Sequence, residues 1–202
     1  MSNYHYYQKN QEDLHSNPSS YDFYFKENHF KFNTDDGVFS KDYIDYGSFA
    51  LLKAFEPNDL VEPILDMGAG YGPIGITINR LYNKEVHMCE INERAYNLIK
   101  KNIEVNKSQN VYPYHSDLYN ELPLDLKFSC VLTNPPIRAG KSVVLSIYDG
   151  AYERLVKGGE LWVVIQKKQG APSSKEYITN LFGNCEIINK DKGYYILKSV
   201  KK

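Results

Sequence analysis

Two short segments of the sequence carry residue types that could do chemistry: an Asn-Pro-Pro turn at 134–136 and a glycine-rich loop at 68–75. Asn134 follows an apolar run, and Pro135 and Pro136 cannot donate the hydrogen bonds of a strand ladder, so the chain must leave a buried strand there with a fixed shape. The side-chain amide of Asn134 and the backbone carbonyl of Pro135 should therefore be held in fixed positions. The alternative is that this segment only ends the strand and has no role in chemistry. The other candidate site residues distinguish between the two.

The glycine-rich loop "DMGAGYGPIG" separates an apolar strand from a helix. Glycines there let the backbone approach a ligand closely, and the N-terminus of the helix offers free N–H groups. Residues 70–75 satisfy the dinucleotide pattern G-x-G-x-x-G, but the position directly after the strand belongs to Gly68. The better match is D-x-G-x-G-x-G, which begins at Asp66 and includes Gly68, Gly70 and Gly72.

Acidic residues close three successive strands of the predicted order: Asp66, Glu90 and Asp117. The carboxyl ends of parallel strands meet at one edge of a sheet, where open α/β folds bind their ligands. We therefore expect the three acids and Asn134 to border one crevice. For each acid taken alone, an ordinary solvated strand end or a helix cap is the alternative.

The elements that must position these residues follow a regular alternation from Pro63 onward. Apolar strands and amphipathic helices take turns, which predicts βαβ units on a parallel sheet. The expected strands are 63–67, 85–91, 111–117, 128–134 and 160–166, and the expected helices are 73–82, 92–106, 142–156 and 175–182. Gly158-Gly159 is expected to close the third helix, and Ser173 with Glu176 to form a capping box for the fourth.

The two ends of the chain differ from this alternation. Strands 185–191 and 193–200 are joined by too few residues for a parallel crossover, so they must form an antiparallel hairpin. Near the start, alternating aromatics predict a second hairpin at 21–34 with its turn at Glu27-Asn28, followed by a helix around residues 46–55. Residues 1–20 have the composition of a polar arm, which leaves a single domain at 21–202 with its core at 60–202.

Composition limits the possible functions. With 24 Lys plus Arg against 25 Asp plus Glu, no global field attracts nucleic acid, so any such contact needs a local basic patch. Three widely spaced cysteines favour a reducing compartment, and no apolar segment suggests export or a membrane span, so we expect a cytoplasmic protein. The five histidines show no metal-binding spacing, and we expect no metal.

The quoted motifs resemble those of a known superfamily. D-x-G-x-G-x-G is similar to motif I of the class I S-adenosylmethionine-dependent methyltransferases, and "TNPP" is similar to motif IV of members that modify conjugated amines. The resemblance implies that the loop holds the methionine part of the cofactor, Glu90 the ribose hydroxyls and Asp117 the adenine amine. It also implies that Asn134 and the Pro135 carbonyl orient the amine, with Asn134 beside the cofactor.

A closer resemblance covers nearly the whole chain. "HYYQKN", "DDGVFSKDYIDYGS", "DMGAGYGPIGI", "TNPPIRAGK", "GGELWVVIQKKQGAPS" and "KDKGYYILKS" resemble the small-domain methyltransferases related to the bacterial 16S rRNA guanine-N2 enzyme. This implies a Rossmann-like fold with a seven-stranded, mostly parallel sheet, and methylation of guanine N2 in small-subunit rRNA or the 30S particle. We expect a monomer.

Residues for RNA contact are expected around the Asn-Pro-Pro turn. Many relatives carry an aromatic residue where this chain has Ile137, so Phe39 is our candidate to stack on the base. The remaining expected substrate contacts are Pro136 and four basic residues on the rim of the crevice, Arg138, Lys141, Lys167 and Lys168. Ordinary solvated lysines are the alternative for that rim.

Other functions remain possible on the same sequence. The acceptor could be adenine N6 or a glutamine amide of a protein. A non-catalytic module for RNA binding or ribosome assembly could use the same fold, although intact Asp66, Glu90 and Asn134 argue against a decayed site. A nicotinamide oxidoreductase is disfavoured because no catalytic donor pair stands out.

Overall fold

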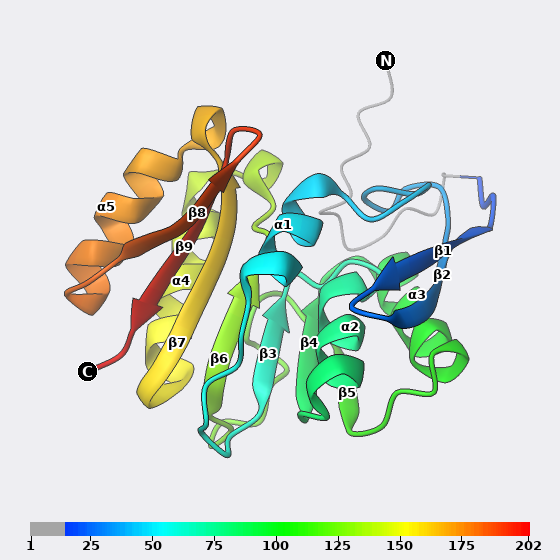
Figure 1. Ribbon diagram of the computed structural model, residues 1–202, viewed down its shortest axis with the longest axis horizontal. Helices are drawn as coiled ribbons and strands as arrows, with labels where there is room; N and C mark the ends of the chain where they lie inside the picture. Colours follow the sequence, from blue (N-terminus) through cyan, green and yellow to red (C-terminus); the bar gives the residue numbers. More distant parts are fainter. Residues whose placement is uncertain (1–14) are drawn as a thin grey trace.

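The computed structural model describes residues 15–202 as a seven-stranded sheet with helices on both faces and a separate N-terminal hairpin (Figure 1). The strand order is β5-β4-β3-β6-β7-β9-β8. Pairs among β3 to β7 are parallel, whereas β9 runs antiparallel to both β7 and β8. The strands are β3 (Ile64–Met67), β4 (Val86–Glu90), β5 (Val111–His115), β6 (Phe128–Thr133), β7 (Leu155–Gln166), β8 (Glu186–Asp191) and β9 (Tyr194–Val200). The predicted fold class is confirmed.

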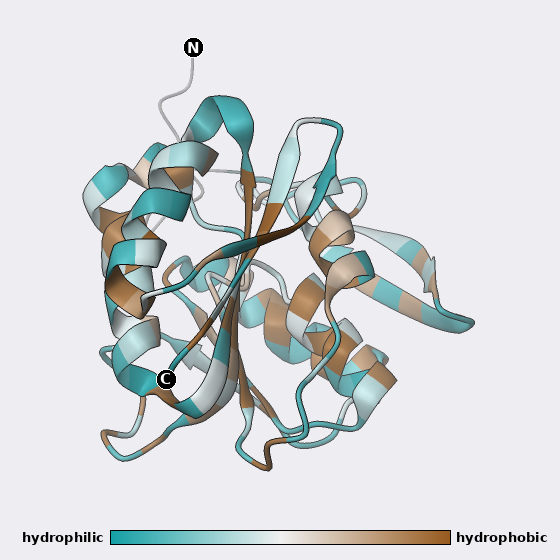
Figure 2. Cartoon of the chain, turned by 60° about the vertical axis from the view of Figure 1, so that its left-hand side comes forward, coloured by the Kyte–Doolittle hydropathy of each residue, from teal (hydrophilic) through white to brown (hydrophobic). Residues whose placement is uncertain are grey.

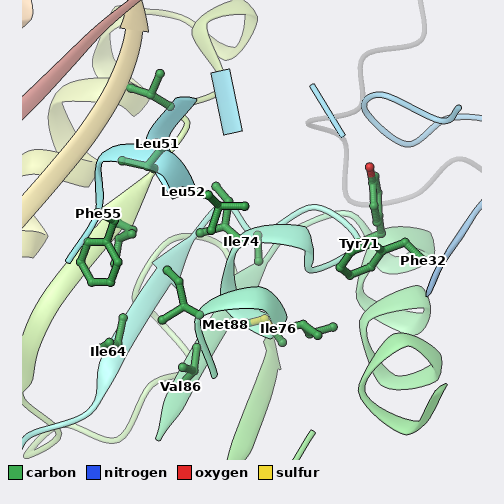
Figure 3. Close-up of a cluster of buried hydrophobic side chains, with 14 of the residues drawn as sticks. Phe32, Leu51, Leu52, Phe55, Ile64, Tyr71, Ile74, Ile76, Val86 and Met88 are labelled. Carbon is green, nitrogen blue, oxygen red and sulfur yellow. The ribbon is translucent and has the colours of Figure 1, made fainter. Parts of the chain in front are cut away.

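Two hydrophobic clusters fill the spaces on the two sides of the sheet. The first lies under α1 (Tyr46–Ala54), α2 (Pro73–Tyr82) and α3 (Glu93–Val105); Figure 3 shows Leu51 and Phe55 there together with Ile64 and Met88. The second lies under α4 (Lys141–Arg154) and α5 (Ala171–Phe182). Hydrophobic colour accordingly follows the central strands and parts of the helices (Figure 2).

Local sequence signals explain where several helices begin and end. Pro73 occupies the first turn of α2, where its missing N–H costs nothing, and Asn83 ends that helix in the left-handed conformation, with φ 50°. Asn92 caps α3 by accepting a hydrogen bond from the Ala95 N–H at 2.9 Å. Both helices begin where the sequence predicts.

The end of α4 differs from the prediction. The helix stops at Arg154, and Gly158-Gly159 lie inside β7 instead of closing the helix. The register with β6 shifts between the pairs Phe128–Leu155 and Cys130–Glu160, so β7 accommodates extra residues as a bulge. Gly158 there has φ 81°, and a Cβ on Gly159 would lie 2.9 Å from a backbone carbonyl oxygen. The glycine pair is therefore needed by the backbone of this bulge and does not end α4.

The start of α5 also differs from the prediction. The helix begins at Ala171, after Gly170 in the left-handed conformation, and no side chain caps it. The Ser173 hydroxyl donates to the Gly170 carbonyl at 2.9 Å, so it is not the cap of a helix that starts later. The predicted capping box of Ser173 and Glu176 is therefore wrong, because Gly170 and Pro172 already provide a start.

The N-terminal hairpin consists of β1 (Ser19–Phe25) and β2 (Asn28–Thr34). Its turn is at Lys26-Glu27, both with positive φ, one residue before the predicted position. Because β1 begins at Ser19, the last two residues of the expected polar arm belong to a strand. Residues 1–14 of that arm lie outside the described residues.

Two asparagines attach the hairpin to the domain: Asn102 in α3 and Asn106, the residue that caps the C-terminus of α3. Asn102 accepts from the Asn33 N–H at 2.7 Å and donates to its carbonyl at 3.0 Å. Asn106 makes the same pair of bonds with Lys31, at 2.9 and 2.8 Å. One turn apart on the helix, the two amides match alternate residues of β2 and satisfy backbone groups that a further strand would otherwise pair.

Candidate active site

The glycine-rich loop lies between β3 and α2, and its glycines have two different roles. Gly68 and Gly70 have φ of 76° and 59°, line a cavity, and have no atom within 4 Å of where a Cβ would lie. Gly72 and Gly75 serve packing instead. A Cβ on Gly72 would lie 2.9 Å from Ile76, and one on Gly75 would overlap Met88. Gly72, an expected cofactor residue, is therefore not part of the cavity wall.

Two of the three expected acids, Glu90 and Asp66, accept hydrogen bonds from backbone N–H groups of this loop and so fix its shape. Glu90 accepts from the Gly70 N–H at 2.7 Å and from the Asn92 N–H at 2.8 Å. Asp66 accepts from the Gly75 N–H at 2.8 Å, and its other oxygen is buried without a partner. Burial raises the pKa of both carboxyls to about 7, against the lowering effect of these backbone hydrogen bonds. Glu90 lines the cavity, whereas Asp66 supports the loop from the interior.

The cavity has two neighbouring parts, which share Gly68, Glu90 and Pro136 as lining residues. The larger part, about 80 Å³, is bordered by Val38, Phe39, Asp45, Ser48, Gly68, Ala69, Gly70, Tyr71, Pro73, Ile74, Glu90, Ala95, Asn134, Pro135 and Pro136. The smaller is an apolar slot of about 20 Å³ bordered by Met67, Gly68, Cys89, Glu90, Ile91, Ser116, Leu118, Pro136 and Ile147. Asp117 lies between two residues of the slot with its side chain exposed.

Asn134 follows the end of β6 and is held by Asp45 and Ser48, which border the same cavity. Its side-chain nitrogen donates to Asp45 Oδ1 at 3.0 Å and to Ser48 Oγ at 3.2 Å. Asp45 is the N-cap of α1 and accepts from the Ser48 N–H at 3.0 Å. The sequence reasoning missed Asp45 and Ser48. The only local signal in the sequence is that Asp45 precedes a helix, and such an Asp indicates an N-cap and not a catalytic role.

The expected substrate residues fall into two groups. Phe39, which is 42% exposed, borders the cavity together with Pro135 and Pro136. Ile137 lies elsewhere: it begins the 3-10 turn η1 (Ile137–Ala139) and packs on the hydrophobic cluster under α4 and α5.

The basic residues are exposed at the same edge of the sheet. Arg138 lies in η1, Lys141 begins α4, and Lys167 and Lys168 form the 3-10 turn η2 (Lys167–Gln169). Between α4 and α5 lies an open groove of about 500 Å³, bordered by Ile137 and Lys141 on one side and by Gln169 and Tyr177 on the other. The structure thus brings the basic turns together beside the Asn-Pro-Pro turn.

Within residues 15–202, no group of three or more His, Cys, Asp or Glu side chains is placed to hold a metal ion. His87 instead interacts with Tyr114 and Glu85, and His115 with the Ile91 carbonyl. In the same part of the chain, no helix combines the length and apolar character needed to cross a membrane.

The family model "Methyltransferase small domain" matches residues 29–198, which include every element from β2 to most of β9. The chain belongs to this family. A Bacillus subtilis member, "Uncharacterized protein YbxB", is 44% identical over the full length of both chains. "Ribosomal RNA small subunit methyltransferase C" of Vibrio parahaemolyticus is 31% identical over 82% of this chain.

Other members of the methyltransferase small domain family differ in the ribosomal subunit that their names give. "Ribosomal RNA large subunit methyltransferase G" of Psychromonas ingrahamii is 26% identical over 85% of this chain. The solved T. thermophilus 16S rRNA N2 methyltransferase RsmC, in complex with AdoMet and guanosine, shares the fold, with a TM-score of 0.83 and 24% identity over 92% of this chain. The chain spans about half of each of these rRNA methyltransferases, 48%, 46% and 51%.

Proposed function

We propose that this protein transfers a methyl group from S-adenosyl-L-methionine to the exocyclic N2 amine of a guanine in small-subunit rRNA. The observation that carries the proposal is the position of Asn134 and Pro135, which border the same cavity as the glycine loop and Glu90. The family assignment supports methyl transfer, and the names of several relatives support rRNA as the substrate.

The residues present fit the cofactor. A Cβ at Gly68 or Gly70 would enter the open space of the cavity, so this backbone leaves room for a ligand. Glu90 would accept from the ribose hydroxyls, Ile91 and Leu118 would border the adenine ring, and Asp117 would accept from the adenine amine. When bound, the cofactor supplies a methyl group on a positively charged sulfur.

The chain's own contribution to the chemistry is orientation of the acceptor amine. The amine of guanine is a weak nucleophile because its lone pair is delocalised into the ring. Asn134 Oδ1 and the Pro135 carbonyl would each accept one of its N–H bonds, which turns the lone pair toward the methyl group. The nitrogen forms the new bond to carbon, the carbon–sulfur bond breaks, and the nitrogen then releases a proton to water. Positioning of this kind can contribute roughly 7 kcal/mol to catalysis.

An RNA substrate suits the surroundings of this cavity. A base must leave its stack to reach Asn134, and Phe39, exposed at the cavity edge, offers a ring on which the base can stack. Arg138, Lys141, Lys167 and Lys168 provide a local positive rim for phosphates on a chain with formal net charge -1.

Labelled methyl transfer tests the proposal. Ribosomal subunits and free 16S and 23S rRNA from a strain lacking this protein would be incubated with the enzyme and labelled S-adenosylmethionine. We expect label in 16S rRNA or 30S particles, recovered as N2-methylguanosine after digestion. Label confined to 23S rRNA or 50S particles would overturn the small-subunit assignment. Label recovered as N6-methyladenosine would overturn the assignment of guanine as the acceptor nucleotide.

Absence of transfer is also informative. If no ribosomal substrate accepts label while S-adenosylhomocysteine still raises the melting temperature, the rRNA substrate is wrong. If NADH raises the melting temperature and S-adenosylhomocysteine does not, the cofactor is wrong as well.

A further inference from the structure

We infer that Asp45 is a positioning residue for methyl transfer, because it selects the orientation of the Asn134 side-chain amide. The inference rests on the proposed function. Asp45 Oδ1 accepts from the Asn134 nitrogen at 3.0 Å, although the two residues are 89 positions apart in the sequence. This contact joins the start of α1 to the end of β6, and both residues border the cavity.

The orientation of this amide decides whether it can serve the reaction. A side-chain amide has a donor end and an acceptor end, and a half-turn about its last bond exchanges them. Only the acceptor end can accept a hydrogen bond from an amine. With the donor end forward, two sets of N–H bonds would face each other. A productive Asn134 therefore needs a partner that accepts only one of the two orientations.

Asp45 meets that requirement and Ser48 does not. An ionised carboxylate only accepts hydrogen bonds, so the nitrogen of Asn134 must face it and the amide oxygen must face away. The Ser48 hydroxyl, 3.2 Å from the same nitrogen, can either donate or accept and so tolerates both orientations. The selection comes from Asp45 Oδ1, an acceptor atom that the Ser48 N–H holds in place facing the nitrogen of Asn134.

Asp45 is itself held precisely. As the N-cap of α1, its Oδ1 also accepts from the Ser48 N–H at 3.0 Å, and its carbonyl accepts from the Phe49 N–H at 3.0 Å. The helix behind it is anchored by the buried side chains of Leu51 and Leu52. Asn134 is thus oriented by a rigid element and not by a loop.

Gly47 leaves the space that this arrangement needs. A Cβ there would lie 3.0 Å from Asp45 Oδ1 and 2.9 Å from the ring of Tyr194. Residue 47 has no positive φ, so the backbone itself does not demand glycine. The close approach of Asp45 and Tyr194 is the physical reason for a glycine at this helical position.

Two substitutions separate the cap from the amide contact. Asp45→Ser keeps a good N-cap for α1, but its shorter side chain does not reach Asn134. Asp45→Asn keeps both the cap and an oxygen at the correct distance. We expect Asp45→Ser to lower kcat about 10- to 100-fold, the usual cost of a misplaced catalytic group, and Asp45→Asn to recover most of it. The melting temperature and the Kd for S-adenosylhomocysteine should match wild type in both.

The amide itself provides a readout that does not depend on the substrate. In the S-adenosylhomocysteine complex, the side-chain ¹⁵NH₂ resonances of Asn134, assigned by their loss in Asn134→Asp, should shift in Asp45→Ser and stay near wild type in Asp45→Asn. If wild-type enzyme methylates no ribosomal substrate, the proposed function fails, whereas these resonances still test the orientation.

Several results would overturn the inference. These are wild-type kcat in Asp45→Ser, unchanged Asn134 resonances in that variant, equal losses of kcat in both variants, or weaker S-adenosylhomocysteine binding, which would place Asp45 on the cofactor.

Gly47→Ala is a further variant that leaves every charged group in place. It should lower kcat through the displaced carboxylate without weakening S-adenosylhomocysteine binding, and wild-type kcat would contradict the inference.

Discussion

At the scale of single residues, the candidate site depends on groups that the fold holds still. Asn134 is tied to Asp45 through its nitrogen, and both oxygens of Glu90 accept from backbone N–H groups. Neither side chain must search for its orientation when a ligand arrives. The conformational entropy of these side chains is therefore lost on folding and not on ligand binding, which is the usual basis of preorganised catalysis.

Removing the amide of Asn134 should separate binding from chemistry. Asn134→Ala takes away one of the two acceptors for the amine, and loss of a comparable oriented group costs roughly 100-fold or more in kcat. The Kd for S-adenosylhomocysteine, measured by calorimetry, should stay within about threefold of wild type, because Gly68, Gly70 and Glu90 are untouched. Equal turnover in the variant would remove the proposed role of Asn134.

The buried carboxyl of Glu90 should make stability depend on pH. Burial raises its pKa to about 7, so the folded protein binds this proton more tightly than the unfolded chain does. The stability it contributes is fully present below the unfolded pKa and is lost as pH rises through 7. Glu90→Gln cannot ionise, so its free energy of unfolding should rise relative to that of wild type by roughly 2 kcal/mol from pH 5 to pH 8, whichever protein is more stable at pH 5.

Urea denaturation at several pH values measures that difference, with Asp125→Asn at an exposed position as the control. The control should follow wild type at every pH. A free energy of unfolding of Glu90→Gln that, relative to wild type, is constant with pH or falls as pH rises would show that Glu90 is not protonated in the folded protein near neutrality.

At the scale of elements, sequence signals predicted those boundaries that local chemistry decides. The helix from Pro73 begins as predicted because proline and the preceding glycine fix the turn. Gly158-Gly159 misled the prediction because a glycine pair also suits a bulge, and the choice depends on the register with β6. Ser173 misled it because the hydroxyl bonds back to Gly170 inside a helix that has already started.

The attachment of the hairpin to α3 makes an element-level prediction. Asn102→Ala removes the partner of the N–H and the carbonyl of Asn33 and of the Tyr71 carbonyl, and leaving such groups unsatisfied costs at least about 1–3 kcal/mol. We expect the free energy of unfolding to fall by about that amount in urea denaturation. Asn120→Ala, at an exposed position, is the matched control and should change it by less than about 0.5 kcal/mol.

At the scale of the whole molecule, the sheet gathers the site from distant parts of the sequence. The loop after β3, Glu90 at the end of β4 and Asn134 after β6 meet at one edge of the sheet, as the alternation of strands and helices predicted (Figure 1). What the sequence could not reveal is the wall supplied by Asp45 and Ser48. That contact depends on how α1 crosses the sheet, and no local pattern encodes this.

The basic rim makes a prediction about the whole surface. If Arg138 and Lys141 contact phosphates, the double variant Arg138→Ala/Lys141→Ala should weaken rRNA binding and reduce the salt dependence, lowering the slope of log K against log salt by roughly 0.7–0.9 per lost contact. Filter binding at several salt concentrations measures it. Lys101→Ala/Lys107→Ala, exposed near the other end of the sheet, is the control, and an equal loss of slope there would mean that the rim is not the RNA surface.

The paired amides of Asn102 and Asn106 have a consequence for how the chain acquires its structure during synthesis. Their partners on β2 are made 69 and 75 residues earlier in the sequence. A lone two-stranded hairpin is at best marginally stable in water, so β1 and β2 depend on partners that are made later in the chain. The backbone groups of β2 are thus completed from the other end of a long stretch of chain, and a nascent chain that ends before residue 102 still lacks both amides.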